Sequence, residues 1–349
     1  MKWLFNFSAS AAGGGLRRLE ETAKWFDRRG GATFLVHATA LQAVSPFSNR
    51  NRYFGIRQGK LKRLIADGRY LPGVIREVGT PDVYFSYGIP LFHNVAKINW
   101  LHVSNALTLT RDRHGMPFKR YLELQLLGNR IVRSLRLAHI ASAESEYALD
   151  LLKTAKRIPG GVRTYVVAGN GCEDALFSLP AGQVGGGGRK YAISVGTAPY
   201  KRLGRALAVF GALQERNPEL QGFKIVGDRT QIPRSVRRDA RVESVGTGIG
   251  DEELYEMIQG AEYYISTSGI ENSSISVTEA LLLARSVILS DIPSHREAVR
   301  GMACAEFHVS GQGVFIEVNP ADRNDEERPP SWSDMLQRLS DTASEYSKG

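Results

Sequence analysis

The sequence predicts an α/β protein made of two successive halves, each built around a parallel sheet. Short apolar segments of strand composition alternate with amphipathic helical segments along most of the chain, which is the pattern of parallel α/β folds. The 349 residues are about twice the usual domain length, and a hydrophobic content of 42% supports two cores. We therefore expect one domain over residues 1–165, a second over 166–330, and a C-terminal helix over 331–349 that packs back on the first domain.

The first half begins with a strand, a glycine turn, a helix and a second strand. The strand over residues 2–7 leads to Gly13–Gly15, and a helix over 16–30 leads to a strand over 32–38. Such a unit starts a parallel α/β sheet. Residues 50–76 are rich in Arg and Lys with scattered aromatic residues. The elements expected after them are strands over 82–88, 96–104 and 139–145 and helices over 118–137 and 146–155.

The second half repeats the alternation after a glycine-rich interruption. Four consecutive glycines, Gly185–Gly188, mark residues 178–190 as a surface loop. The acidic, proline-containing segment 319–332 breaks the pattern again, and a final helix is expected from about Ser333. Between these segments, the expected strands cover 191–196, 223–228, 240–246, 262–268 and 286–291, and the expected helices cover 200–218, 251–261 and 294–302.

A polar segment between two of these strands, ENSSISVTE, is bracketed by Glu271 and Glu279. Ser276 and Glu279 fit the S-x-x-E capping box, so a helix is expected to begin near Ser276. The N–H groups at its start would hold an anion such as a diphosphate, and Glu271 on the preceding loop would reach a hydroxyl-rich ligand beside it. The local sequence fits equally well a Glu279 that only caps the helix, and a glutamate such as Glu271, taken in isolation, is more often a solvated loop acid.

Three further local signals lie elsewhere in the sequence, and two of them have a structural alternative. Ser294 and Glu297 form a second S-x-x-E box, which predicts the start of the helix over 294–302. Gly13–Gly15 would let a ligand approach the backbone closely, although a tight turn explains them equally well. His102 stands at or near the carboxyl end of its strand, where ligands collect in open α/β sheets, although a lone histidine there is more often structural.

A dinucleotide-binding domain is not predicted. The first glycine run is not G-x-G-x-x-G, and His37 and Thr39 stand where an Asp or Glu would end the second strand. A nicotinamide-dependent oxidoreductase therefore fits the α/β pattern but lacks its fingerprint.

Charge is divided unevenly between the halves. Residues 1–165 contain 26 Lys and Arg against 11 Asp and Glu, a net charge of +15, whereas residues 166–349 contain 19 against 25, a net charge of −6, which leaves +9 for the chain. A basic half indicates an anionic partner such as an acidic lipid surface, a phosphorylated acceptor or a nucleic acid. Arg130, Arg133 and Arg136 share a face of their helix, which suits phosphate groups and equally a solvated surface.

The remaining composition points to a soluble or peripheral protein. Cys172 and Cys304 make neither a disulfide framework nor a metal-ligand cluster, which fits a reducing cytoplasm. No segment has the roughly 18 uninterrupted apolar residues of a membrane span. The apolar part of residues 1–15 is too short for a good signal peptide.

The second half carries an ordered series of motifs. In chain order they are ISVGTAPYKR, FKIVGD, VGTGIGDEELYEMIQGAEYYISTS, ENSSISVTEALLLARSVILSD and IPSHREAV. With these motifs the chain resembles the retaining GT-B glycosyltransferases of family 4, which join sugars from nucleotide donors to acceptors. The spacing from Glu271 to Glu279 is similar to the E-x7-E signature of that family. The resemblance implies a GT-B fold, in which two Rossmann-like domains with parallel sheets face an interdomain cleft.

The resemblance also implies roles for individual residues. The catalytic group would comprise Glu271 beside the donor sugar, Lys201 on the donor diphosphate, and His102 near the donor sugar. The backbone of Asn272–Ile275 would contact sugar and phosphate, and Glu279 would hold ribose hydroxyls. The implied donor-binding residues are Gly14, Gly15, Thr197, Lys201, Arg202, Gly246, Thr247, Gly248, Ile249, Asn272, Ser273, Ser274, Ile275 and Glu279.

The chain departs from the family pattern in two places. Thr197 stands where the family often has an arginine after the glycine of the strand, so phosphate clamping would come from Lys201, from Arg202 or from elsewhere in the chain. Asn272–Ser274 replace the common Gly-Phe-Gly run, which leaves the donor sugar open. Gly246–Ile249 correspond to the loop that packs the nucleotide base, and such a loop rarely identifies the base.

The implied function is that of a retaining hexosyltransferase that uses a nucleotide-sugar donor and needs neither a metal nor a cofactor. Its acceptor would be a glycan or a polyprenyl-diphosphate-linked sugar in bacterial surface polysaccharide or lipopolysaccharide synthesis. The basic half would dock on anionic lipid at the inner face of the plasma membrane or on the acceptor phosphate, and no nucleic acid is expected as a partner. Two other functions stay open: a GT-B sugar-nucleotide epimerase or hydrolase, and a nonenzymatic nucleic-acid-binding protein.

Overall fold

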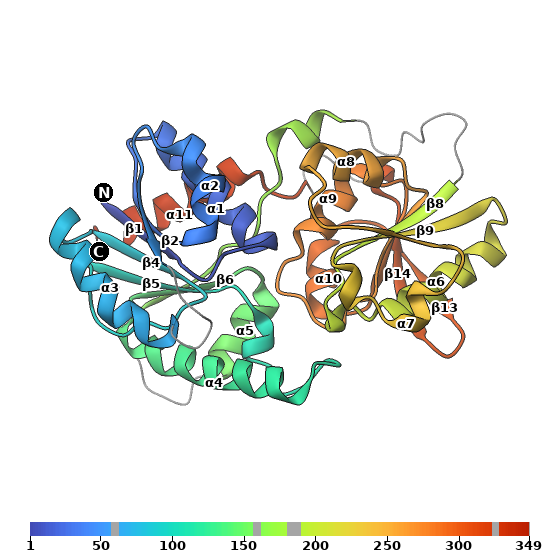
Figure 1. The fold of residues 1–349 in the computed structure, drawn as a ribbon, viewed down its shortest axis with the longest axis horizontal. Helices are drawn as coiled ribbons and strands as arrows, with labels where there is room; N and C mark the ends of the chain where they lie inside the picture. The colour runs from blue at the N-terminus through green and yellow to red at the C-terminus, as the bar shows by residue number, and fades with distance from the viewer. Residues whose placement is uncertain (57–62, 156–161, 180–189, 323–327, 349) are drawn as a thin grey trace. The chain divides into compact units, whose positions relative to one another are not determined.

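The chain forms two compact units, each with its own sheet (Figure 1). The computed structural model describes residues 1–56, 63–155, 162–179, 190–322 and 328–348. The first unit consists of Met1–Arg111, Lys119–Gly171 and Pro330–Gly349, and the second consists of Asp112–Phe118 and Cys172–Pro329. The end of the sequence therefore belongs to the same unit as its beginning.

The first sheet has seven parallel strands in the order β3-β2-β1-β4-β5-β6-β7. The strands are β1 (Trp3–Phe7), β2 (Thr33–His37), β3 (Arg52–Ile56), β4 (Val83–Tyr87), β5 (Ile98–Val103), β6 (Ile140–Ala143) and β7 (Thr164–Val167). The helices that accompany them are α1 (Gly13–Arg28), α2 (Leu41–Val44), α3 (Arg63–Val78), α4 (Phe118–Ser134), α5 (Glu146–Thr154) and α11 (Trp332–Tyr346). The predicted parallel α/β class is confirmed for this half.

The central strands of this sheet are buried on both faces. All five residues of β1 and of β4 and all six of β5 are buried, as expected for parallel strands covered by helices on both sides. Aromatic rings join the strands, because Phe5 on β1 lies 5.1 Å from Phe34 on β2 and 5.5 Å from Phe85 on β4 between ring centroids. These ring contacts hold neighbouring strands together, and so they fix the positions of the carboxyl ends of the strands.

The glycine run after β1 does not form the turn that the sequence predicts. Helix α1 begins at Gly13, whose φ is +60°, so Gly14 and Gly15 belong to its first turn. A Cβ on Gly15 would lie 3.1 Å from Ser10 Oγ and 3.6 Å from the ring of Tyr87. The small residue therefore lets the start of α1 approach the end of β4.

The basic segment over residues 50–76 contains two elements that the sequence analysis does not predict. Strand β3 lies at the edge of the sheet, and its side chains are mostly exposed or half-buried. An edge strand of this kind has no continuous apolar run, so it lacks the signal that marks the central strands. The backbone of α3 follows it.

The C-terminal helix α11 packs against α1 within the first unit. It begins at Trp332, one residue before the predicted start, because Ser331 caps it in a true capping box: Ser331 Oγ accepts the N–H of Asp334, whose carboxylate accepts the N–H of Ser331. Arg18 of α1 lies 3.5 Å from Met335 Sδ. The buried side chains of α11 are Trp332, Met335, Leu336, Leu339 and Ala343.

The second sheet also has seven strands, in the order β10-β9-β8-β11-β12-β14-β13. Its strands are β8 (Lys190–Val195), β9 (Leu220–Val226), β10 (Val242–Val245), β11 (Tyr263–Ser266), β12 (Val287–Ser290), β13 (Cys304–Val309) and β14 (Gly313–Val318). Its helices are α6 (Leu203–Arg216), α7 (Arg234–Arg237), α8 (Asp251–Gln259), α9 (Ile275–Leu283) and α10 (Pro293–Ala298). The strands from β8 to β12 pair in parallel, whereas β14 and β13 add an antiparallel hairpin that the sequence analysis does not predict.

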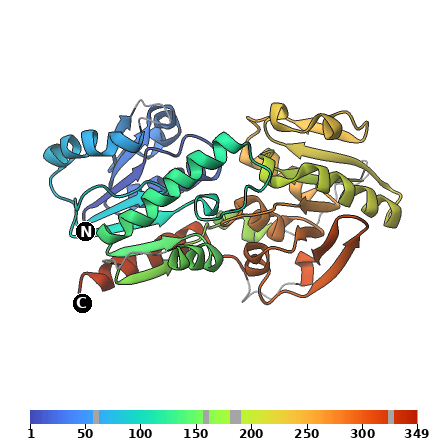
Figure 2. The same ribbon diagram turned by 90° about the horizontal axis from the view of Figure 1, so that it is seen from below.

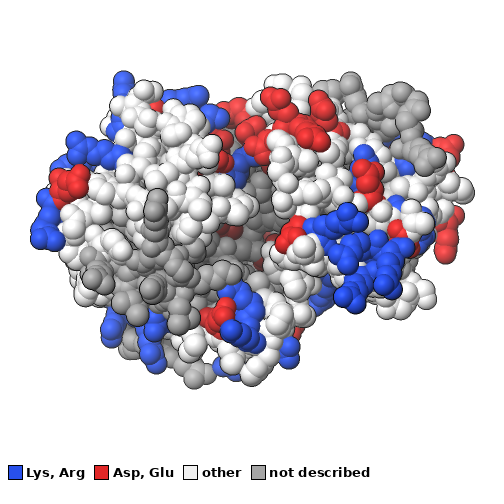
Figure 3. All heavy atoms as spheres, viewed as in Figure 1, with Lys and Arg blue, Asp and Glu red and all other residues white. Residues whose placement is uncertain are grey.

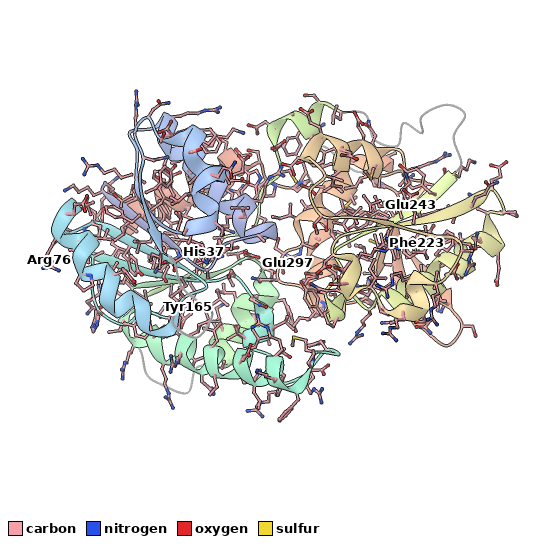
Figure 4. The ribbon with its side chains drawn as sticks, in the orientation of Figure 1. His37, Arg76, Tyr165, Phe223, Glu243 and Glu297 are labelled. Carbon is pink, nitrogen blue, oxygen red and sulfur yellow. The ribbon has the colours of Figure 1, made fainter. Side chains whose placement is uncertain are left out.

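Helices cover both faces of the second sheet, and neighbouring residues of one strand enter different cores. On β11, Tyr264 packs into the core that includes α8 and α9, while Ile265 packs into the core that includes α6. This alternation follows from the two-residue period of a strand. Phe223 (Figure 4) belongs to the second core, 5.2 Å from the ring of Phe210.

The second predicted capping box is wrong. Helix α10 begins at Pro293 with Ile292 as its N-cap, so Ser294 lies inside the first turn and Glu297 (Figure 4) lies near the end of the helix. Proline suits the first helical position, where the missing N–H breaks no helical bond.

Two other expectations concern the chain as a whole. The glycine run Gly185–Gly188 lies outside the described residues. Among the helices that are described, none is long and apolar enough to cross a bilayer.

Candidate functional site

The order of strands in the second sheet reverses between β8 and β11. From β8 the chain adds β9 and β10 on one side, and it then returns to add β11 and β12 on the other. In open α/β sheets, ligands bind beyond the carboxyl ends of the strands at such a switch point. The loop after β8 contains Lys201, and the loop after β11 contains Glu271.

Lys201 and Glu271 form an ion pair, although they lie far apart in the sequence. Lys201 Nζ is 2.6 Å from Glu271 Oε1, and the two side chains are 12% and 10% exposed. Ser268 Oγ donates a hydrogen bond of 2.7 Å to the same carboxylate oxygen. Because water is largely excluded, the two charges attract more strongly than a surface pair would. The pair is held in place, and a small part of each side chain remains accessible to solvent.

Several contacts fasten the loop after β8 to the loop after β11. The Gly269 N–H donates to the backbone carbonyl oxygen of Tyr200 at 2.8 Å, and Thr267 Oγ1 lies 2.9 Å from the carbonyl oxygen of Lys201 and 3.1 Å from that of Arg202. The guanidinium of Arg202 lies against Gly269, where a Cβ would come within 2.5 Å of its Cζ. These contacts hold the two loops together.

The aliphatic part of Lys201 lies along the backbone of Gly196. Gly196 has a φ of +94°, and a Cβ there would lie 2.9 Å from Lys201 Cε. Burial alone would lower the pKa of Lys201, but the charge of Glu271, with Tyr200 and Tyr264, outweighs burial and raises that pKa. Lys201 is therefore fully cationic at neutral pH.

The helix of the ENSSISVTE segment begins near Ser276 as predicted, but without the predicted capping box. Helix α9 starts at Ile275 with Ser274 as N-cap, and the Ser274 side chain makes no capping hydrogen bond. Because the backbone oxygen of Ser274 already accepts helical hydrogen bonds, Ser276 lies inside the helix and the predicted box is wrong. Glu279 lies in the second turn, 4% exposed, and its Oε1 accepts a hydrogen bond of 3.3 Å from Tyr255.

A chain of hydroxyl groups runs from the sheet to the start of α9. Tyr264 OH donates to Ser276 Oγ at 2.9 Å, and Ser276 Oγ lies 3.2 Å from Ser274 Oγ. Burial raises the pKa of Tyr264 to about 12, against the opposing charge of Lys201. Tyr264 is thus a neutral donor that holds the serines in place.

His295 of α10 is a further buried group that feels the charges of this site. Its side chain is 1% exposed, and Nδ1 lies 2.8 Å from the carbonyl oxygen of Ser290. Burial lowers the pKa of His295, although the carboxylate of Glu271 opposes this effect. The ring is therefore neutral, with Nδ1–H donated to Ser290, while Nε2 has no hydrogen-bond partner among the described residues.

The other residues predicted for donor binding in this unit follow the carboxyl ends of the same sheet. Gly246–Ile249 connect β10 to α8, and a Cβ at Gly246 or Gly248 would meet nothing within 4 Å. Thr197 is buried after β8, while Asn272–Ile275, at the start of α9, are buried or half-buried. The structure thus brings these positions to the edge of the sheet that carries Lys201.

Gly14, Gly15 and His102 belong to the first unit. The first sheet has its own switch point between β1 and β4, and His102 lies on the neighbouring β5 with no exposed surface. Its Nδ1 is 2.8 Å from Ser142 Oγ, and its ring stacks on Tyr87 at 5.1 Å. Burial and the charge of Arg18 hold the pKa of His102 well below its ordinary value, so the ring is neutral.

His102 is part of a buried polar network that the sequence analysis does not predict. Glu144 accepts a hydrogen bond of 2.8 Å from Tyr87 and lies 3.8 Å from Arg18 and 3.7 Å from His102 Nε2. Arg18, 1% exposed, also donates to the backbone oxygen of Ala168. The network joins α1, the ends of β4 to β6 and the segment after β7. The feature of the sequence that could have indicated it is the position of Glu144 at the end of a strand.

Within the described residues, no three His, Cys, Asp or Glu side chains gather closely enough to hold a metal ion. Cys172 is buried and Cys304 is exposed, and neither forms a disulfide.

No protein-family model matches the sequence, and no curated protein matches it either. Solved structures share its fold. The Anabaena protein HepE, in complex with UDP and glucose, is 15% identical with a TM-score of 0.64 over 99% of this chain and 100% of that chain. A glycosyltransferase from Rickettsia africae is 12% identical with a TM-score of 0.66 over 100% and 99% of the two chains. The sucrose-phosphate synthase of Thermosynechococcus elongatus is 14% identical with a TM-score of 0.61 over 86% and 84%. The predicted GT-B fold of two Rossmann-like domains is confirmed.

Proposed function

We propose that this chain is a glycosyltransferase that moves a sugar from a nucleoside-diphosphate sugar to a hydroxyl acceptor. The Lys201–Glu271 pair at the switch point of the second sheet carries the proposal. It offers a cation for the diphosphate and a carboxylate for sugar hydroxyls, 2.6 Å apart and both partly accessible. HepE, which is similar in fold, was solved with UDP-glucose, so a UDP-sugar is the first donor to test.

In the proposed reaction, the bond between the anomeric carbon and the diphosphate oxygen breaks, and the acceptor oxygen forms its bond to the same face of the sugar. The acceptor proton passes to the departing phosphate oxygen, so no covalent enzyme intermediate is needed. Lys201 stabilises the negative charge on the leaving group, an interaction of about 4 kcal/mol at about 4 Å and an effective dielectric of about 20. Glu271 orients the sugar by accepting hydrogen bonds from its hydroxyls.

The roles of the other donor-binding residues are those that the resemblance to family 4 implies. We propose Arg202 and Thr197 near the phosphates, Gly246–Ile249 on the base and Glu279 on the ribose, with Asn272–Ile275 between sugar and phosphate. A metal-free reaction with retention of configuration is part of the proposal. The approach of His102, Gly14 and Gly15 to the donor sugar stays a prediction, as does a glycan or polyprenyl-diphosphate-linked acceptor in bacterial surface polysaccharide synthesis on the cytoplasmic side.

Donor identity is tested by thermal unfolding of the full chain with a panel of UDP-, GDP- and ADP-sugars. A ligand at 100 times its dissociation constant stabilises the folded state by about 2.7 kcal/mol. The same preparation with donor alone shows whether the sugar is released or epimerised without an acceptor, which would favour a hydrolase or an epimerase over a transferase.

Catalysis is tested with Lys201→Ala and Glu271→Gln, each of which is expected to reduce transfer nearly to background in a protein that remains folded. The matched control is Lys190→Ala, because Lys190 forms a surface pair with Glu219 at 2.5 Å in the same unit. The control should keep normal turnover. Near-normal turnover of either site variant would reject the assignment.

A further inference from the structure

Helix α4 carries an apolar stripe on its outward face. Phe118, Leu122 and Leu126 are 59%, 45% and 63% exposed, and their i, i+4, i+8 spacing puts them on one side of the helix. Phe118 is the first residue of α4 and is grouped with the second unit, whereas Leu122 and Leu126 belong to the first. The opposite side is buried through Leu124 and Ile131. Three of the nine exposed large hydrophobic side chains in the described chain lie on this single stripe, so it is a surface feature and not the usual scatter of exposed apolar groups.

Cations flank the stripe. Lys119, Arg130 and Arg133 are exposed and form no ion pair with any described residue, and helical geometry places them beside the stripe or in line with it. The single acid of α4, Glu123, is paired with Arg120 at 2.9 Å. Figure 2 shows α4 running along the surface of the first unit that faces the viewer, and Figure 3 shows Lys and Arg side chains along the lower edge of that unit, where α4 lies in Figure 1.

The combination of an apolar stripe and cations selects one kind of partner. A nucleic acid would use the cations but leave the stripe exposed to water, and a solvated face would have no need of three large apolar side chains. A helix that lies in the interface of an anionic bilayer uses both, because its apolar side chains enter the acyl boundary while Lys and Arg meet lipid phosphates. Charge and apolarity together therefore point to a lipid surface.

We propose that α4 is the helix by which this protein docks, in the plane of the interface, on an anionic lipid bilayer. Helix α4 follows β5, and a right-handed crossover starts such a helix at the carboxyl edge of the sheet. Docking through its first turns brings the carboxyl edge of the first sheet toward the lipid headgroups. The inference goes beyond the proposed function and does not depend on it, because vesicle binding requires no sugar donor.

The test is flotation of the full chain with phosphatidylcholine vesicles, with and without phosphatidylglycerol. Wild type should float with the anionic vesicles and much less with the neutral ones. Lys119→Gln/Arg130→Gln/Arg133→Gln should weaken partitioning about a hundredfold, since each cation near an anionic surface contributes about fivefold. Leu122→Ser/Leu126→Ser should weaken it about tenfold, because partly exposed leucines lose about half of their apolar transfer.

Two control variants change a matched surface elsewhere. Arg234→Gln/Arg237→Gln/Arg238→Gln removes the same charge from α7, over which Figure 3 shows a dense patch of basic side chains. Val314→Ser removes an apolar side chain that is 37% exposed on β14. Both should float like wild type. Unchanged unfolding temperatures and unchanged binding of UDP-glucose in all variants would separate a failure of this inference from a failure of the fold or of the proposed function.

The inference is overturned if wild type floats with neither vesicle, if the α4 variants float like wild type, or if the α7 variant loses as much binding as the α4 charge variant. It is also overturned if Leu122→Ser/Leu126→Ser leaves flotation intact but converts a dimer to a monomer, since the stripe would then be an interface between copies. Loss of RNA binding in the α4 charge variant with intact flotation would assign the cations to a nucleic acid.

Discussion

Replacement of Lys201 by methionine is expected to destabilise the second unit by about 3 kcal/mol. Methionine keeps an apolar stem along Gly196 but removes the ammonium that lies 2.6 Å from Glu271. Removing one partner of a buried ion pair costs about 3–5 kcal/mol. The value should fall at the lower end, because Ser268 still donates to the carboxylate and about a tenth of the Glu271 side chain is exposed.

The cost should disappear when the unpaired charge is removed as well. Lys201→Met/Glu271→Gln should regain most of the lost stability. With the single Glu271→Gln variant completing the double-mutant cycle, the coupling energy of the two residues should be at least about 2 kcal/mol. The matched cycle on Lys190 and Glu219, whose side chains are 32% and 71% exposed, should give less than about 1 kcal/mol.

The two units can be followed separately because all four tryptophans of the sequence lie in the first unit. Tryptophan fluorescence therefore reports urea unfolding of the first unit, while far-ultraviolet circular dichroism reports both. With a denaturant slope of about 2 kcal/mol per molar urea, a loss of 3 kcal/mol moves a midpoint by about 1.5 M. Lys201→Met should shift the part of the circular dichroism transition that comes from the second unit by this amount and leave the fluorescence transition in place.

Two results would refute this reasoning. One is a Lys201–Glu271 coupling no larger than that of the surface pair, which would mean that the site pair is effectively solvated. The other is an equal shift of the fluorescence transition, which would mean that the energy of the pair is not confined to the second unit.

Three further predictions concern single residues. Gly196→Ala should destabilise the second unit by about 1–3 kcal/mol and weaken donor binding, because φ is +94° and the new Cβ meets Lys201 Cε at 2.9 Å; Gly211→Ala, in an open position of α6, should stabilise by about 0.5–1 kcal/mol in the same urea titration. Burial lowers the pKa of His295, so below about pH 6.5 the unfolded chain binds more protons than the folded one, and stability decreases as the pH is lowered. His295→Gln should make this decrease smaller. An unchanged dependence of stability on pH would contradict the assignment of His295 as a buried neutral ring. Ser331→Ala should lower the stability of the first unit by about 1 kcal/mol through loss of the cap of α11, and the midpoint of the fluorescence transition measures this loss. An unchanged midpoint would show that the cap does not contribute to stability.

Much of the fold can be predicted from the sequence because the central strands are short buried apolar runs. The fully buried β1, β4 and β5 carry that signal. Strand β3 does not, since it lies at the sheet edge with exposed side chains. The β13–β14 hairpin adds antiparallel strands to a parallel sheet, and the first three residues of β13 are exposed. Its usable signals are the alternation of Phe307 and Val309 and the glycines of the turn.

The residues of the candidate site can be predicted from the sequence, but their arrangement in space cannot. Lys201 and Glu271 each stand out in the sequence, yet their contact depends on β8 and β11 being neighbours, which no local pattern encodes. Both S-x-x-E boxes fail because that spacing also occurs inside helices that start one residue before the serine. His295 and Tyr264 are missed because burial, and not residue type, gives them their place beside the charges.

The division of the first unit into three stretches of sequence has a consequence for biosynthesis. Trp332, Leu336 and Leu339 of its core come from α11, so residues 1–171 leave the ribosome without the side chains that complete their packing. All of the second unit, Asp112–Phe118 and Cys172–Pro329, is synthesised before α11. Domains generally fold as units in the order in which they emerge. Here the unit that contains the N-terminus is the last to become complete, so the second unit closes its core first, and a nascent chain stalled before Pro330 presents a finished second unit attached to an unfinished first one.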